Sequence, residues 1–231
     1  GLTIDALEWV ASHNGGTFVN DQGEITINNP QAAQALDMAA SWVGNIAPAS
    51  VLNSGEEEAR AIFMKGNAVF MRNWAYAWSL SQTDDSTLRG KVGVTVLPKG
   101  GESGQSAAGT GGWQLAVSKY SRHPEEAVDL VMFLTSKEVQ KQRAILGSYQ
   151  PTIRSLYRDQ DILREVPFIA SQYPTFANTV NRPATTTADK YNEVSEVIWE
   201  TSHQVLTKKV NGQQAVEKME KQLKEIRGSG W

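Results

Sequence analysis

The sequence predicts an α/β fold in which short strands are distributed among a larger number of helices. Apolar residues recur at helical spacing in many segments, whereas a few short runs rich in Val, Ile and Phe have the composition of strands. Gly, Pro and Asn separate these segments. Because the strands are scattered between helices, layers of helix and sheet are favoured over a helical bundle.

The N-terminal part alternates between helix and hairpin signals. Residues 2–11 predict the end of a helix, since apolar side chains fall on one face. Residues 17–19 and 24–27 are β-prone and flank a turn-forming stretch, which predicts a hairpin. The next helix begins near Pro30, where a preceding Asn can cap it.

The middle of the chain carries three predicted strands. They are expected at 68–71, 92–97 and 113–117, each a short apolar run. A helix at 56–65 precedes them and opens with three Glu residues. These carboxylates suit the positive end of a helix; general acid–base chemistry is the alternative.

The C-terminal part is predicted to be helical. Apolar periodicity indicates helices at 124–134, 136–146, 189–207 and 213–227. Residues 228–231, Gly-Ser-Gly-Trp, are expected to form a flexible linker or tag outside the fold.

Composition excludes several classes of function. The chain of 231 residues has 22 Lys and Arg against 25 Asp and Glu, a formal net charge of −3. This balance, without a basic block, does not favour binding to nucleic acid or anionic membranes. Cysteine is absent, which excludes thiol catalysis and Cys-based metal sites. The three His residues lack metal-ligand spacing, so we expect neither a metal nor a cofactor.

Enzyme motifs are weak in this sequence. The run Gly109-Thr110-Gly111-Gly112 resembles the start of a dinucleotide-binding loop, but Gln114 takes the third glycine position and a predicted strand follows. Nucleophile-elbow, Walker and His-Glu-x-x-His motifs are not found. No pair of carboxylates stands out for glycoside hydrolysis. We therefore expect a protein that is not an enzyme.

The aromatic residues are more informative. Trp74, Tyr76 and Trp78 cluster where a predicted strand meets the start of a helix, and Trp113 follows two glycines. An indole beside a Gly-rich loop can present a flat apolar face, which packs on the C–H face of a sugar ring. The alternative is that these side chains fill the core. Three further Trp residues lie on amphipathic helices and are expected in the core: Trp9, Trp42 and Trp199.

The order and spacing of these motifs resemble the C-terminal half of a bacterial extracellular sugar-binding protein. Such proteins are the solute receptors of ABC importers, here of the maltose- and trehalose-binding group. The matching stretches are Ala61–Met71, Asn73–Trp78, Val92–Pro98, Gly111–Ser118 and Tyr149–Thr152.

This resemblance implies an incomplete type II periplasmic-binding-protein clamshell, of which the chain would be the C-terminal portion. Residues 1–97 and 148–227 would belong to the second lobe, and residues 98–147 to the first lobe. The crossings near Pro98 and Gly147 would then be hinges, and the ligand would lie between the lobes.

The resemblance also implies a sugar site. Trp74 would stack on a sugar ring, while the Gly-Gly-Trp loop would add backbone contacts and a second stack. Tyr149 and Arg182 would line the cleft. The alternative for Tyr149 is an aromatic side chain in a turn, and the alternative for Arg182 is a surface charge; each alternative has the same weight as the binding role. The full set of expected contacts is Trp74, Tyr76, Gly111, Gly112, Trp113, Tyr149 and Arg182.

The implied function is the sugar-binding component of an ABC transporter, with a disaccharide-type ligand. Expected partners are the sugar, a complementary N-terminal half or a second copy, and the permease, in a periplasmic or extracellular location associated with the membrane through the transporter. Two positions depart from the family: Ala75 replaces a usual Pro, and Ser54 stands where a Tyr is common. These departures suggest an alternative, an engineered scaffold or split-protein half that assembles with a partner chain.

Overall fold

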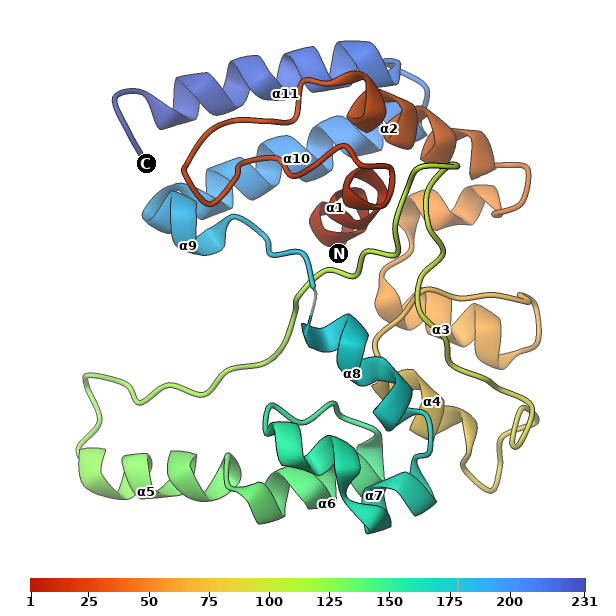
Figure 1. Ribbon diagram of the computed structural model, residues 1–231, viewed down its shortest axis with the longest axis vertical. Helices are drawn as coiled ribbons and strands as arrows, with labels where there is room; N and C mark the ends of the chain where they lie inside the picture. The colour runs from red at the N-terminus through yellow and green to blue at the C-terminus, as the bar shows by residue number, and fades with distance from the viewer. Residues whose placement is uncertain (178) are drawn as a thin grey trace. The chain divides into compact units, whose positions relative to one another are not determined.

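The computed structural model describes residues 1–177 and 179–231, which are predominantly helical (Figure 1). They divide into two compact units. Unit 1 comprises Gly1–Ala59, Val96–Thr110 and Thr175–Trp231; unit 2 comprises Arg60–Thr95 and Gly111–Pro174. The expected division into lobes concerns the complete protein and stays a prediction.

Four long helices build the core of unit 1. They are α1 (Leu2–Ser12), α2 (Pro30–Trp42), α10 (Tyr191–Leu206) and α11 (Gly212–Arg227). Every one of them packs against at least two of the others, around buried side chains such as Leu7, Phe18, Leu36, Ile198 and Met219. Unit 1 also holds three shorter elements: η1 (Ala49–Asn53), α9 (Ala184–Thr187) and η3 (Ala188–Lys190).

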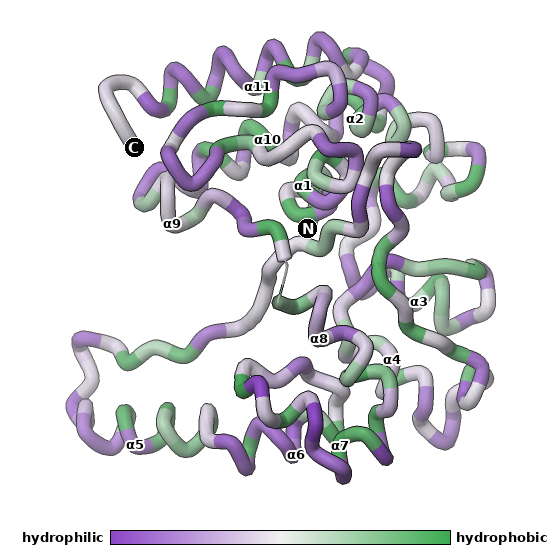
Figure 2. Tube along the Cα trace, in the orientation of Figure 1, coloured by the Kyte–Doolittle hydropathy of each residue, from purple (hydrophilic) through white to green (hydrophobic). Residues whose placement is uncertain are grey.

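Helix caps explain where two of these helices begin. The Asn29 side chain accepts a hydrogen bond from the Ala32 amide at the start of α2, as predicted. Asn211 and Gln214 form a reciprocal capping box at the start of α11. Along α11, hydrophilic and hydrophobic residues alternate (Figure 2), because one face packs on the core and the other meets solvent.

Unit 2 consists of short helices joined by extended segments. Its helices are α4 (Tyr76–Ser81), α5 (Pro124–Leu134), α6 (Lys137–Gly147), η2 (Arg154–Arg158) and α7 (Gln160–Glu165). The unit boundaries fall within two further helices, α3 (Glu56–Met64) and α8 (Ile169–Ala177). Helices α7 and α8 come in addition to those that the sequence predicts.

The predicted strands are not formed in this chain. Within residues 1–177 and 179–231, β-pairing is limited to three isolated bridges: Val19–Ile25, Val43–Ala47 and Gly109–Val180. The first bridge marks the predicted hairpin, reduced to a single pair. The residues of the predicted strands at 68–71, 92–97 and 113–117 have no regular secondary structure and no ladder partners, and residue 69 lies in a bend. A strand is stabilised by backbone hydrogen bonds to a neighbour, and here the neighbours are missing.

The last residue, Trp231, packs on unit 1, unlike the free tag expected from composition, whereas residues 228–230 are exposed. Trp231 lies against the hydrophobic core, and its Nε1 donates a hydrogen bond of 2.8 Å to the Gly23 carbonyl. Lys190 Nζ donates to the carbonyls of Ile226, Arg227 and Gly230. None of the described helices has both the length and the apolarity needed to cross a bilayer.

Candidate functional site

Trp74 and Gly111, which are far apart in the sequence, meet in unit 2. A Cβ atom on residue 111 would lie 2.4 Å from Cη2 of Trp74, so the indole rests directly on the Gly111 backbone. The Trp74 amide donates to Asn73 Oδ1 at 2.8 Å, and its carbonyl accepts from Ala77 in the first turn of α4. The backbone on both sides of the indole is therefore anchored, while the side chain is half-buried.

Arg72 holds the indole from a second direction. Its guanidinium carbon lies 4.8 Å from the centre of the Trp74 ring, in cation–π geometry. Together with the Gly111 backbone, this contact restricts the positions that the indole can take. Arg72 was not predicted from the sequence. The available signal was its position two residues before Trp74, because alternate residues of an extended segment lie on the same side.

Trp113 is the most exposed large apolar residue described in the chain, with 95% of its surface accessible. Its neighbour Gly112 has open space where a Cβ would point. An indole so fully in water is unusual for a side chain of this size. Both Trp74 and Trp113 are thus accessible, as expected; that they form one wall of a cleft stays a prediction.

Tyr76 and Tyr149 occupy different surroundings. Tyr76 is the first residue of α4 and is half-buried. Tyr149 follows the left-handed residue Ser148 and folds back on α6, where Arg143 lies 5.0 Å from its ring. A Cβ on Gly147 would come within 2.6 Å of that ring. The recorded contacts of Tyr149 are therefore with the end of α6 and not with Trp74.

Arg182 belongs to unit 1 and is exposed. It follows a short paired segment, in which Thr110 donates to the Val180 carbonyl and Val180 donates to that of Ala108. A buried carboxylate supports this pairing, since Glu8 accepts a 2.8 Å hydrogen bond from the Gly109 amide. Glu8 stands among apolar residues on the inner face of α1, and this break in the pattern was the signal that sequence reasoning passed over.

The two departures from the expected motif have ordinary local roles. Ser54 donates to the Ser50 carbonyl at the end of η1. Ala75 has φ −57° and ψ −29° just before α4. These dihedrals lie within the range that a Pro can adopt.

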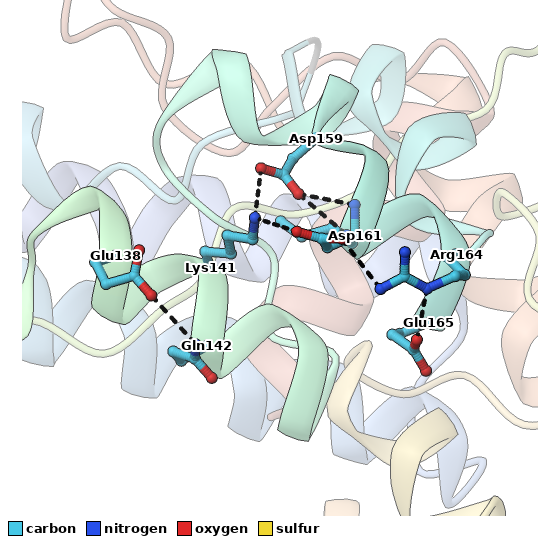
Figure 3. Close-up of polar contacts among 8 residues, drawn as sticks. Glu138, Lys141, Gln142, Asp159, Asp161, Arg164 and Glu165 are labelled. Atoms are coloured by element: carbon cyan, nitrogen blue, oxygen red, sulfur yellow. Dashed lines mark hydrogen bonds and ion pairs between the residues drawn. The ribbon is translucent and has the colours of Figure 1, made fainter.

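A charge network links α6 to α7 in unit 2 (Figure 3). Lys141 Nζ lies 3.0 Å from Asp159 and 2.7 Å from Asp161, and Asp161 also contacts Arg164 at 3.0 Å. Hydrogen bonds from Lys141 lower the pKa of both aspartates, and the two carboxylates raise the pKa of Lys141. Asp159 also caps α7. Ionised, paired carboxylates of this kind serve packing and are poorly suited to act as general acids.

Comparison with known proteins decides the family. The sequence pattern described as "Bacterial extracellular solute-binding protein" matches residues 1–141, more than half of the chain. The chain belongs to this family. A probable ABC transporter-binding protein of Deinococcus radiodurans is 50% identical over all 231 residues, which cover 55% of that relative. An arabinooligosaccharide-binding protein of Bacillus subtilis is 27% identical over 136 residues, covering 57% of this chain and 31% of the relative.

Solved structures of the family show the same fold. Maltose-bound MalE3 of T. maritima superimposes with a TM-score of 0.90 at 38% identity, covering 98% of this chain and 57% of that one. The GacH receptor of Streptomyces glaucescens gives a TM-score of 0.83 at 20% identity, covering 99% and 58%. The chain thus spans little more than half of its relatives and has the fold of part of a type II clamshell.

These findings confirm the family resemblance and several of its implications. The chain belongs to the bacterial extracellular solute-binding proteins, and this family description supports an extracellular or periplasmic location. Solute-binding proteins are generally not enzymes, in agreement with the lack of catalytic motifs. The relatives named above do not support the hypothesis that the chain is engineered.

Proposed function

We propose that this chain forms part of the receptor of an ABC importer for a disaccharide-type sugar. The observation that carries the proposal is the Trp74 indole, half-exposed and held between Arg72 and the Gly111 backbone. An indole fixed in this way presents a flat apolar surface suited to the C–H face of a sugar ring. The likeness to a maltose-bound structure supports the same ligand class.

The expected contact residues would make three kinds of contact with the sugar. Trp74 and Trp113 would supply stacking surfaces, and the Gly111 and Gly112 backbone would let the sugar approach closely. Tyr76, Tyr149 and Arg182 would contribute hydroxyl and guanidinium groups to the sugar hydroxyls. In the complete protein, residues 1–97 and 148–227 would form most of one lobe and residues 98–147 part of the other.

Binding would act through closure of the two lobes. A sugar that contacts both lobes favours the closed state, and that state would dock on the permease, which would bring the receptor to the membrane. On one wall alone the sugar stays half hydrated, and a single aromatic contact contributes only about 0.5–1.5 kcal/mol. This is less than the cost of immobilising a ligand.

Titration of maltose, trehalose and glucose tests the proposal. For the isolated chain we expect a dissociation constant on the order of millimolar or weaker. For the complete receptor we expect tight binding that Trp74→Ala weakens about tenfold or more, a loss of roughly 1.4 kcal/mol. Trp199→Ala is the matched control. The sequence places Trp199 in the core, but this expectation is wrong, because the indole is 43% exposed on α10. Equal effects of the two substitutions, or micromolar binding by the isolated chain, would contradict the proposed site.

A second candidate function is assembly with a partner chain, as in a split protein. The exposed apolar residues of α5 favour it, because they lack cover within the described chain. The mass of the protein at native concentration separates the two: a stable self-dimer favours assembly between copies, and a monomer favours a part of a receptor.

A further inference from the structure

A pocket of unit 2 lies between η2 and α8, and none of its residues belongs to the expected sugar contacts. Its volume is about 260 Å³, and its lining residues are Arg154, Tyr157, Arg158, Ala170, Tyr173 and Pro174. All of them lie in unit 2, so the pocket belongs to a single compact body. Pockets for drug-sized ligands measure roughly 300–1,000 Å³, and a volume below this range suits a small molecule.

Two tyrosine rings form the firmest part of the pocket wall. The ring centres of Tyr157 and Tyr173 lie 5.1 Å apart at an interplanar angle of 61°, an edge-to-face arrangement that stabilises aromatic pairs. Tyr157 is buried, and burial raises the pKa of its phenol above the ordinary value of 10, so the group stays neutral at pH 7. Ala170 and Pro174 complete the wall, and none of the lining residues is acidic.

Two arginines bring positive charge to this wall. The guanidinium carbon of Arg154 lies 5.4 Å from the centre of the Tyr173 ring, in cation–π geometry, which restricts its position. Arg158 is exposed at the other end of η2. Across residues 1–177 and 179–231, neither guanidinium has a recorded ion pair or hydrogen bond. The N–H groups of both side chains are therefore available to a ligand.

The acidic residues that follow η2 are already paired (Figure 3). Lys141 contacts Asp159 at 3.0 Å and Asp161 at 2.7 Å, and Arg164 contacts Glu165 at 3.0 Å. These ion pairs leave the positive charges of the pocket without a carboxylate from α7. A guanidinium group presents a planar fork of donors that matches the oxygens of a carboxylate or phosphate. The pocket thus combines an apolar wall with unbalanced charge that favours an oxyanion.

We infer that this pocket is a second ligand site, which binds a small organic anion: a carboxylate or phosphate on a flat apolar body. The two guanidinium groups contact the oxygens, and the tyrosine rings contact the apolar body. An exposed ion pair contributes little by itself in water, so binding depends on both kinds of contact. The ligand bridges η2 and α8, the helix through which the chain leaves unit 2 after Pro174.

Titration of the 231-residue chain with benzoate and with phenyl phosphate tests the inference. Both probes carry an oxyanion on an aromatic ring; inorganic phosphate lacks the ring, and benzyl alcohol lacks the charge. By calorimetry at low salt, we expect the better aromatic anion to bind about tenfold or more tightly than phosphate or benzyl alcohol, and it identifies the preferred oxyanion. Hydrogen exchange of the amides in η2 and α8 should slow when it is bound. Phosphate that binds as tightly as phenyl phosphate, or no binding of either aromatic anion at about 10 mM, would overturn the inference.

Substitutions locate the bound anion. Arg158→Gln should weaken binding about tenfold or more, while its urea midpoint stays unchanged because the side chain is exposed and makes no recorded ion pair. Arg154→Lys keeps the charge but removes the planar fork, so it should also weaken binding. Arg122→Gln is the matched control, since Arg122 is an exposed arginine of unit 2 outside the pocket. Equal losses for Arg158→Gln and Arg122→Gln would mean that the anion responds only to net charge, and the site would be rejected. Trp74→Ala should leave anion binding unchanged, which distinguishes this site from the sugar site.

Discussion

Gly111 lies so close to Trp74 that no larger residue fits at position 111 without moving the indole. A Cβ there would come within 2.4 Å of Cη2 and 3.0 Å of Cζ3, far inside normal contact distance. The Gly-Gly sequence before Trp113 therefore has a second role besides flexibility. Its first glycine is the surface on which the other tryptophan of the proposed site rests.

Gly111→Ala should displace the indole of Trp74. We expect a loss of stability of about 1–3 kcal/mol, the usual cost of overpacking, together with a change in the near-ultraviolet dichroism of tryptophan. Gly112→Ala is the matched control, because a Cβ at residue 112 meets nothing within 4 Å. Urea unfolding of both variants measures the difference. If Gly112→Ala costs as much as Gly111→Ala, backbone freedom and not the indole contact explains the loss.

Ala75→Pro should stabilise the chain. The φ of Ala75 is −57°, and no hydrogen bond from its amide is recorded, so Pro fits without losing a donor. We expect a gain of about 0.4–1 kcal/mol through the unfolded state, seen as a higher urea midpoint. Ala77→Pro should do the opposite and cost about 1 kcal/mol, since it removes the Ala77 amide that donates to the Trp74 carbonyl. A lower midpoint for Ala75→Pro would show that Trp74 cannot adopt the extended backbone that Pro demands of its predecessor.

The sequence predicts the helices well because their signals are local. Periodicity and the Asn29 cap are both contained within a few residues, and α2, α10 and α11 form close to where these signals place them. A strand depends on a partner distant in sequence. Val69 and Phe70 have strand composition, but without a neighbour the composition cannot produce a ladder.

The same distinction applies to the candidate site. Trp74 and Gly111 are recognisable as motifs, but their contact depends on how two remote segments meet. Arg72 and Glu8 were missed because each acts on a group outside its own local pattern, one on an indole and the other on the Gly109 amide. The sequence predicts that Trp231 lies outside the fold, because the three preceding residues, Gly-Ser-Gly, are typical of a linker. In the structure its side chain packs on unit 1.

The charge network of α6 and α7 should make stability fall in acid. The pKa values of Asp159 and Asp161 lie below their ordinary value of 3.8, so their contribution is present above that pH and is lost as the pH falls through the lowered values. The pKa of Lys141 lies above 10.5, so its contribution is present below that pH and is lost as the pH rises through the raised value.

Lys141→Met should therefore lower the urea midpoint at pH 7, and the difference from the original protein should shrink at pH 3 and below. Lys137→Met is the control, because Lys137 is exposed on the same helix and no ion pair is recorded for it. A difference between Lys141→Met and the original protein that stays constant from pH 7 to pH 2 would mean that the lysine stem, through packing, matters more than its charge.

Trp231 should contribute measurably to the stability of unit 1. Its ring packs on the core, and its Nε1 donates a 2.8 Å hydrogen bond to the Gly23 carbonyl in the turn of the reduced hairpin. Partial burial of an indole and one net hydrogen bond together suggest a loss of about 1–2 kcal/mol for Trp231→Ala. Trp231→Phe keeps most of the apolar contact and removes only the donor, so it should lose about half as much.

Trp113→Ala, at a residue 95% exposed, should stay within about 0.5 kcal/mol of the original protein. Chemical unfolding followed by far-ultraviolet dichroism, which does not depend on the tryptophan removed, measures all three. If Trp231→Ala is as neutral as Trp113→Ala, the terminal residues do not rest on the fold, and the linker expected from their composition is the better description.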